Sequence, residues 1–137
     1  MEREIVKDIM FLKMRSAPAG LADKQTALDL TDTLKANSAR CVGLAANMIG
    51  VRKRMIIVQT PLAPIVMLNP RIISHSGKSY EAEEGCLSLE GTRKALRHET
   101  IEVEYFDMSM KRRTGTYSGF TAQIIQHEID HCNGIII

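Results

Sequence analysis

The stretch QHEIDHCNGIII, residues 126–137, places His127 and His131 four residues apart. In an α-helix, with about 3.6 residues per turn, such residues differ by only about 40° around the axis, so their imidazoles project side by side. Glu128 lies about 60° round from His131 on the same helix. This H-E-x-x-H pattern is typical of two metal-binding histidines accompanied by a general-base glutamate. The stretch therefore predicts a helix that carries part of a metal site.

The residues before this pattern also have helical spacing. Phe120 and Ile124 fall on the same stripe as the two histidines, and Asn133 with Gly134 is a typical helix stop signal. The alternative is a helix whose histidines make ordinary polar contacts and bind no ion. We favour the metal site because Glu128 has the required position.

Two histidines leave a catalytic metal site incomplete, because such an ion usually has three protein ligands and one open position. A further histidine at residue 137 would complete a longer zinc-protease pattern, but Ile137 stands there. The third ligand must therefore lie upstream, where the candidates include Cys41, Cys86, His75 and His98.

Cys86 is the favoured third ligand. It follows Gly85, which allows close approach of the backbone, in a segment that looks too irregular for a core strand. The alternative is a thiol that simply packs in the interior. Cys132 points about 100° away from His131 on the helix, so we expect it in the core.

Length and composition are those of one ordinary domain. The chain has 137 residues, of which 45% are hydrophobic and 25% charged, with a net charge of +2. We expect a single domain over residues 1–137, with no membrane-spanning segment and no nucleic-acid partner. Three cysteines, an odd number, and no secretory signal predict a cytoplasmic protein with free thiols. The oligomeric state is left open.

The fold class predicted is α+β, mostly antiparallel strands around the C-terminal helix with one earlier helix. Leucines at helical spacing predict that earlier helix from about Asp23, as a possible N-cap, to Ala39. Three β-rich runs separated by prolines, residues 54–60, 65–69 and 71–76, favour an antiparallel meander. Alternating apolar residues from position 101 predict a further, half-buried strand.

Three segments, taken together and in order, resemble the peptide deformylase family. The family motifs are Gly-x-Gly-φ-Ala-Ala-x-Gln, Glu-Gly-Cys-Leu-Ser and Gln-His-Glu-x-Asp-His. This chain has CVGLAANM at 41–48, EGCLS at 84–88 and QHEIDH at 126–131. The resemblance implies a deformylase-like fold and a metal-dependent hydrolase that removes the formyl group from N-formylmethionyl peptides or nascent chains.

The resemblance also implies the residues of the site. Cys86, His127 and His131 would hold one divalent ion, Fe(II) in the cell and replaceable by Ni or Zn, and Glu128 would act as general acid and base. The Leu87 backbone N–H would help to bind the oxyanion, and Val42 and Gly43 would bond to the substrate backbone. Apolar walls for a methionine side chain would come from Val42, Phe120 and Ile124, with Gln123 as a polar neighbour, although such a helical stripe is equally typical of a core.

Two positions of the first segment depart from the family motif. Cys41 replaces a glycine, and Met48 replaces the glutamine whose amide donates to the oxyanion. Methionine has no hydrogen to donate, and losing one such donor typically lowers kcat by about 10²- to 10³-fold. We therefore expect reduced activity. Asn47 could supply an amide only if the segment shifted by one residue.

Other interpretations stay open. The main alternative is a non-catalytic, deformylase-like protein that binds metal and peptide, and a peptidase is a weaker one. Packing is favoured over a redox role for Cys41. Glu84 would either pair with Arg97 or Arg93 or face solvent. Many bacterial deformylases contact the ribosome through a further C-terminal helix that this sequence lacks, so the resemblance leaves direct ribosome docking doubtful.

Overall fold

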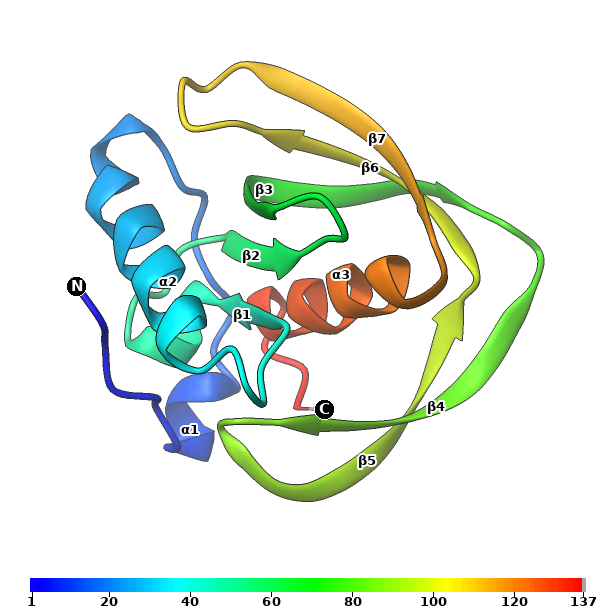
Figure 1. The fold of residues 1–137 in the computed structure, drawn as a ribbon, viewed down its shortest axis with the longest axis horizontal. Coiled ribbons are helices and arrows are strands. Elements are labelled where there is room, and N and C mark those ends of the chain that lie inside the picture. Colours follow the sequence, from blue (N-terminus) through cyan, green and yellow to red (C-terminus); the bar gives the residue numbers. More distant parts are fainter. Residues whose placement is uncertain (137) are drawn as a thin grey trace.

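The C-terminal helix predicted from the histidine pattern lies at the centre of the fold (Figure 1). In the computed structural model, which describes residues 1–136, this helix is α3 (Gly119–Cys132). Gly134 ends it with a left-handed φ of +74°, and its N–H donates to the His131 carbonyl at 3.1 Å. A glycine is the residue best suited to that conformation, so the predicted stop is confirmed.

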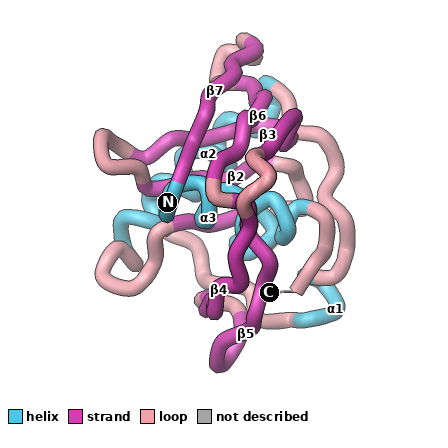
Figure 2. The backbone as a smooth tube through the Cα atoms, turned by 90° about the vertical axis from the view of Figure 1, so that its right-hand side faces the viewer, coloured by secondary structure: helices cyan, strands magenta, loops and turns pink. Residues whose placement is uncertain are grey.

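Five antiparallel strands form the main sheet, in the spatial order β1-β2-β3-β6-β7. Their bounds are β1 (Gly43–Ala45), β2 (Met55–Gln59), β3 (Pro64–His75), β6 (Thr100–Phe106) and β7 (Arg112–Ser118). β4 (Ser79–Cys86) and β5 (Leu89–His98) pair with each other in a separate two-stranded sheet. Figure 2 shows this hairpin and the main sheet on opposite sides of α3. The α+β class and the antiparallel pairing are as predicted.

The core forms where helices cover both faces of the sheet. Met55, Ile56, Ile57 and Val58 of β2 are fully buried, because β2 contacts both α2 (Lys24–Ala36) and α3. A strand covered on both faces needs apolar residues at every position rather than at alternate ones. Complete burial of each such side chain stabilises the fold by about 1.5–3 kcal/mol.

The early helix is shorter than predicted. It runs from Lys24 to Ala36 and follows a 3₁₀ turn, η1 (Leu21–Asp23). The Asp23 carboxylate does not cap the helix, because it accepts from the Gly20 N–H at 2.8 Å. At the other end the Asn37 side chain donates to the Thr33 carbonyl at 2.8 Å, and this local bond replaces a further helical turn. A second short helix, α1 (Ile9–Leu12), was not predicted.

The sequence predicted that Pro70 separates two strands, but in the structure it does not. β3 continues through it, and its pairing with β6 shifts register between Leu68 and Arg71. Asn69 has a φ of +51° there, and its side-chain amide exchanges two hydrogen bonds with the Ala19 backbone, of 2.8 and 3.0 Å. A bulge of this kind admits a proline, which cannot donate to the strand ladder.

The predicted strand from residue 101 is confirmed as β6, in which Ile101 and Val103 are buried. The first deformylase-like segment forms β1 and then a 3₁₀ turn, η2 (Ala46–Ile49). Within residues 1–136, no helix has the length and apolar character needed to cross a membrane.

Candidate metal centre and active site

Three potential ligand atoms converge between α3 and the end of β4. His131 Nε2 lies 3.4 Å from Cys86 Sγ and 3.2 Å from His127 Nε2, and the donor atoms of all three residues lie within 4.8 Å of one another. Tetrahedral ligands about 2.0–2.3 Å from an ion are about 3.3–3.8 Å apart, so the set fits one ion. It is the only such group of three among the residues that the structure describes.

The hairpin β4–β5 brings Cys86 to the helix. Cys86 is the last residue of β4, outside the main sheet, and the register with β5 shifts between Gly85 and Cys86, which agrees with the irregularity expected of this segment. The side-chain amide of Gln126 fixes the hairpin to α3. It accepts from the His98 N–H and donates to the His98 carbonyl, both at 2.9 Å. Sequence analysis missed this role, although Gln126 belongs to the third motif.

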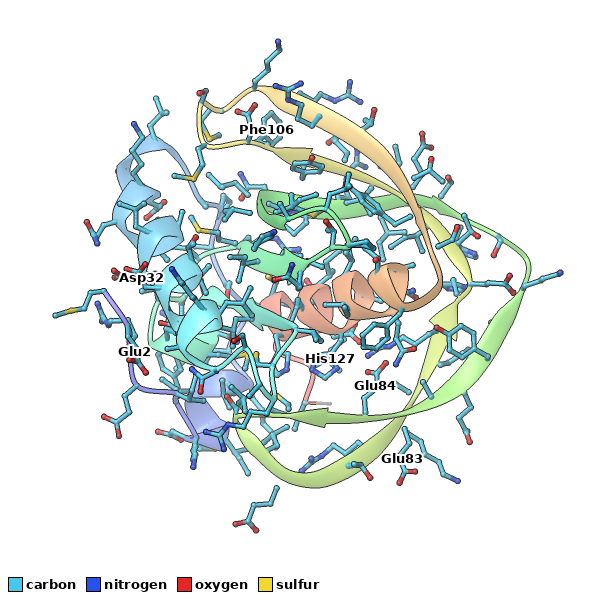
Figure 3. The ribbon with its side chains drawn as sticks, viewed as in Figure 1. Glu2, Asp32, Glu83, Glu84, Phe106 and His127 are labelled. Carbon is cyan, nitrogen blue, oxygen red and sulfur yellow. The ribbon has the colours of Figure 1, made fainter. Side chains whose placement is uncertain are left out.

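A buried carboxylate orients His127. Its Nδ1 lies 2.8 Å from Glu84 Oε1, and Figure 3 shows the two side chains meeting in the space between α3 and β4. A carboxylate can only accept, so Nδ1 donates a proton to Glu84 and Nε2 is the nitrogen that would face the ion. Of the interpretations left open for Glu84, the structure selects the pairing with Arg97.

Besides the bond from His127, Arg97 provides a second link between Glu84 and α3. Its guanidinium donates to Glu84 through Nε at 2.9 Å and through NH2 at 2.6 Å, and NH1 donates to Asp130 at 2.6 Å. The side chains of Arg97 and Glu84 are each only 5% exposed. This charged chain ties β4, β5 and α3 together behind the ligands.

The charges of this cluster follow from its contacts. Burial raises the pKa of Glu84, but the bonds from His127 and Arg97 outweigh it and lower the pKa to about 2. Burial alone accounts for most of the opposite change at Glu128, whose pKa rises to about 7. Burial lowers the pKa of His131 to about 3, so this imidazole is neutral. Burial also lowers the pKa of His127, but its bonds with Cys86 and Glu84 outweigh burial and raise that pKa to about 10, so an ion that binds at Nε2 displaces a proton.

Glu128 is suited to move protons. Its Oε1 is buried and has no hydrogen-bond partner among residues 1–136, and its side chain lines the same cavity as Cys86 and His127. A carboxyl group whose pKa is near 7 can both accept and donate a proton at neutral pH. These properties suit the role that the H-E-x-x-H pattern predicts for Glu128.

The three deformylase-like segments meet in one cavity of about 460 Å³. Its walls include Val42, Gly43 and Met48 from the first segment, Cys86 and Leu87 from the second, and His127 and Glu128 from the third. His131 is fully buried behind Cys86. The structure thus gathers the residues of all three segments, whereas His75 and His98, the other histidines considered as ligands, stack on each other with ring centroids 3.7 Å apart and do not line the cavity. The volume is that of a typical small-ligand site.

Gly43 allows the first segment to approach Glu128. A Cβ atom at this position would lie 2.7 Å from Ile124 Cγ2, closer than real contacts permit, and 3.0 Å from Glu128 Oε2, which is tighter than most real contacts. Because β1 is the edge strand and the Val42 carbonyl already accepts from the Gln59 N–H at 2.8 Å, the outward backbone groups are those of Gly43. Val42 contributes its side chain to the cavity wall.

Met48 brings a thioether to the place of the family amide. Its side chain is 1% exposed, and its sulfur accepts from the Ala45 N–H at 3.5 Å. Asn47 does not replace that amide, because its Nδ2 donates to the His131 carbonyl at 3.0 Å and its side chain does not line the cavity.

Cys41 lines the cavity without joining the ligand cluster. Its thiol donates to the Gly43 carbonyl at 3.1 Å, and burial raises its pKa to about 11. Both facts agree with a packed, protonated thiol.

Comparison with known proteins points to the same family as the three gathered segments. The family model described as polypeptide deformylase matches residues 5–137. A peptide deformylase of Clostridium beijerinckii is 52% identical over 137 residues, which is all of both chains, and one of Desulforudis audaxviator is 41% identical over 82% of this chain and 73% of its own.

A solved structure has the same fold. The class I type b peptide deformylase from Acinetobacter baumannii, bound to Met-Ala-Ser, has a TM-score of 0.90 and 30% identity over 99% of this chain and 97% of its own. This match, the family model and the gathered cysteine and histidines lead to one conclusion: the chain belongs to the peptide deformylase family of metal-dependent hydrolases.

Proposed function

We propose that this protein removes the formyl group from N-formylmethionyl peptides and nascent chains, at a rate lowered by Met48. The observation that carries the proposal is the position of Glu128, a buried carboxylate that shares one cavity with the Cys86 and His127 donors. The Met-Ala-Ser peptide bound by the Acinetobacter relative has the form of the expected product. We infer that residues 1–137 act as one domain in the cytoplasm, where nascent chains are made.

Cys86, His127 and His131 would hold the divalent ion, for which we propose Fe(II), with Ni or Zn as substitutes. When bound, that ion would polarise the formyl carbonyl and acidify a water molecule. Thiolate and imidazole ligands suit both iron and zinc, so the donor set itself does not choose between them.

The reaction needs one proton transfer in each direction. Glu128 would take a proton from the water that attacks the formyl carbon and return it to the amine as the C–N bond breaks, which releases formate. The Leu87 N–H would donate to the oxyanion as it forms. The outward backbone of Gly43 would pair with the substrate peptide as an added strand at the sheet edge.

Met48 favours a second candidate, a protein that binds metal and peptide without turnover. The missing amide donor leaves the oxyanion with fewer partners, and loss of such a donor costs about 2.7–4 kcal/mol of transition-state stabilisation. A slow enzyme and a binding protein differ in whether any formate appears.

Formate release from formyl-Met-Ala-Ser distinguishes the two. We would load the protein with Fe(II) anaerobically, or with Ni(II), and compare it with Met48→Gln and with Met48→Leu as a size control. The proposal predicts slow turnover by the natural chain and by Met48→Leu, and a rise of about 10²-fold or more in Met48→Gln. Turnover only in Met48→Gln would support the binding function instead.

A further inference from the structure

One wall of the cavity carries a polar side chain among apolar ones. Gln123 lies on α3 between Phe120 and Ile124, and all three line the cavity. It precedes His127 by four residues, so the two project from the same face of the helix. An amide in the wall of a pocket for an apolar side chain costs free energy unless its polar atoms find partners.

The carbonyl oxygen of the Gln123 amide already has a hydrogen-bond partner. The Tyr80 hydroxyl of β4 donates to Gln123 Oε1 at 3.0 Å. This bond fixes the carbonyl half towards Tyr80 and leaves the NH₂ half for the cavity. Within residues 1–136, Nε2 of Gln123 donates no hydrogen bond and is not fully buried. Because Gln123 lines the cavity, this NH₂ group is available to a ligand there.

The spacing along α3 indicates which ligand atom would reach it. Four residues of helix advance about 6 Å, so the Cα atoms of Gln123 and His127 lie about that far apart along the axis. In a formylmethionyl substrate, five bonds separate the formyl carbon from the thioether sulfur, a span of about 6 Å when extended. With the formyl group at His127 and Glu128, the sulfur can therefore come beside Gln123.

We propose that Gln123 is a specificity-determining residue whose Nε2–H donates to the thioether sulfur of the substrate's first residue, with Tyr80 as its positioning residue. The inference rests on the proposed function and adds a reason for choosing methionine. An apolar pocket alone barely separates side chains of equal length, whereas a hydrogen-bonding group rejects an analogue that cannot pair with it. Sulfur is a weak acceptor, and a methylene group accepts nothing.

Norleucine is the matched probe, because it replaces the sulfur by a methylene and keeps the length. We would measure the Kd of Met-Ala-Ser and Nle-Ala-Ser for the metal-loaded protein by calorimetry, and kcat/KM for their formyl derivatives. The variants are Gln123→Leu, Tyr80→Phe and, as a control for pocket shape, Phe120→Leu.

The natural chain should prefer Met over Nle by about 3- to 10-fold, the effect of one weak neutral hydrogen bond. Gln123→Leu should abolish or reverse that ratio, because Leu offers no donor, and Tyr80→Phe should reduce it. Phe120→Leu should change the binding of both peptides by the same factor. A purely structural role for Gln123 or Tyr80 would also move both peptides together.

The possible outcomes distinguish failure of this inference from failure of the proposed deformylase function. Equal preference for Met and Nle in the natural chain, or a ratio unchanged in Gln123→Leu, overturns the inference and leaves the deformylase function standing. Binding with the predicted ratio but no formate supports the inference and contradicts the proposed catalysis. No binding and no turnover with any peptide overturns both.

Discussion

His127 Nδ1 lies 2.8 Å from Glu84 Oε1, behind the metal-facing side of the imidazole. The carboxylate fixes the tautomer and the ring orientation of a residue that we propose as a ligand. Loss of such an outer partner typically lowers metal affinity by about 10- to 100-fold. We expect this loss in Glu84→Gln, measured as the Kd for Ni(II) or Zn(II) by competition with a chelator.

Glu81→Gln is the matched control, since Glu81 is exposed on the same strand and makes only a surface ion pair with Lys94 at 3.7 Å. Its metal affinity should equal that of the natural chain. An unchanged Kd in Glu84→Gln would show that Glu84 does not support the site.

Arg97 should matter most for stability. Its removal leaves the buried Glu84 carboxylate without its bidentate partner, and breaking a buried ion pair in this way costs about 3–5 kcal/mol. We expect Arg97→Met to lower the free energy of unfolding by that amount in urea denaturation. Arg71→Met, which removes an ion pair from a side chain 67% exposed, should change it by less than about 1 kcal/mol. Equal effects of the two substitutions would contradict the account.

Gly43→Ala should impair the site and the fold together. The new methyl group would meet Ile124 and Glu128 at less than ordinary contact distance. Such overpacking costs about 1–3 kcal/mol, and a displacement of Glu128 by about 1 Å can lower kcat by about 10²-fold. Gly77→Ala is the control, because a Cβ there meets nothing within 4 Å. Full formate release by Gly43→Ala would show that the close approach is not required.

The thiol of Cys41 should react slowly near neutral pH. Its pKa of about 11 means that the reactive thiolate is scarce at pH 7, about one part in 10⁴. Because the thiolate is the deprotonated form, the alkylation rate by iodoacetamide should rise about tenfold per unit between pH 7 and 9. Mass spectrometry of the peptide that contains Cys41 measures it. Alkylation at pH 7 as fast as that of free cysteine would revive the redox interpretation.

Local patterns in the sequence were sufficient for α3 and for the relative positions of its histidines and Glu128. His127, Glu128 and His131 share one helix, so their geometry follows from the helical period alone. The Cys86 donor was one of several candidates, because its approach depends on the hairpin docking through Gln126 and Arg97, contacts between residues far apart in the chain. No local pattern contains that information.

The strands predicted least well are those without apolar alternation. β4 and β5 carry mostly charged and small residues, and besides pairing with each other they are held to α3 by buried polar contacts rather than by an apolar face. Pro70 caused the opposite error, a predicted break where the strand continues, because a bulge at Asn69 admits a proline within a long strand. Such features become visible only when the partner strand is known.

Formate release and metal content, measured together in Glu128→Gln, test the central claim most directly. This substitution keeps the shape of the side chain and removes its ability to move a proton. The account predicts one bound ion per chain, as in the natural protein, with formate release from formyl-Met-Ala-Ser lowered by about 10²- to 10⁴-fold. Formate release by Glu128→Gln at the natural rate, with the ion bound, would contradict it.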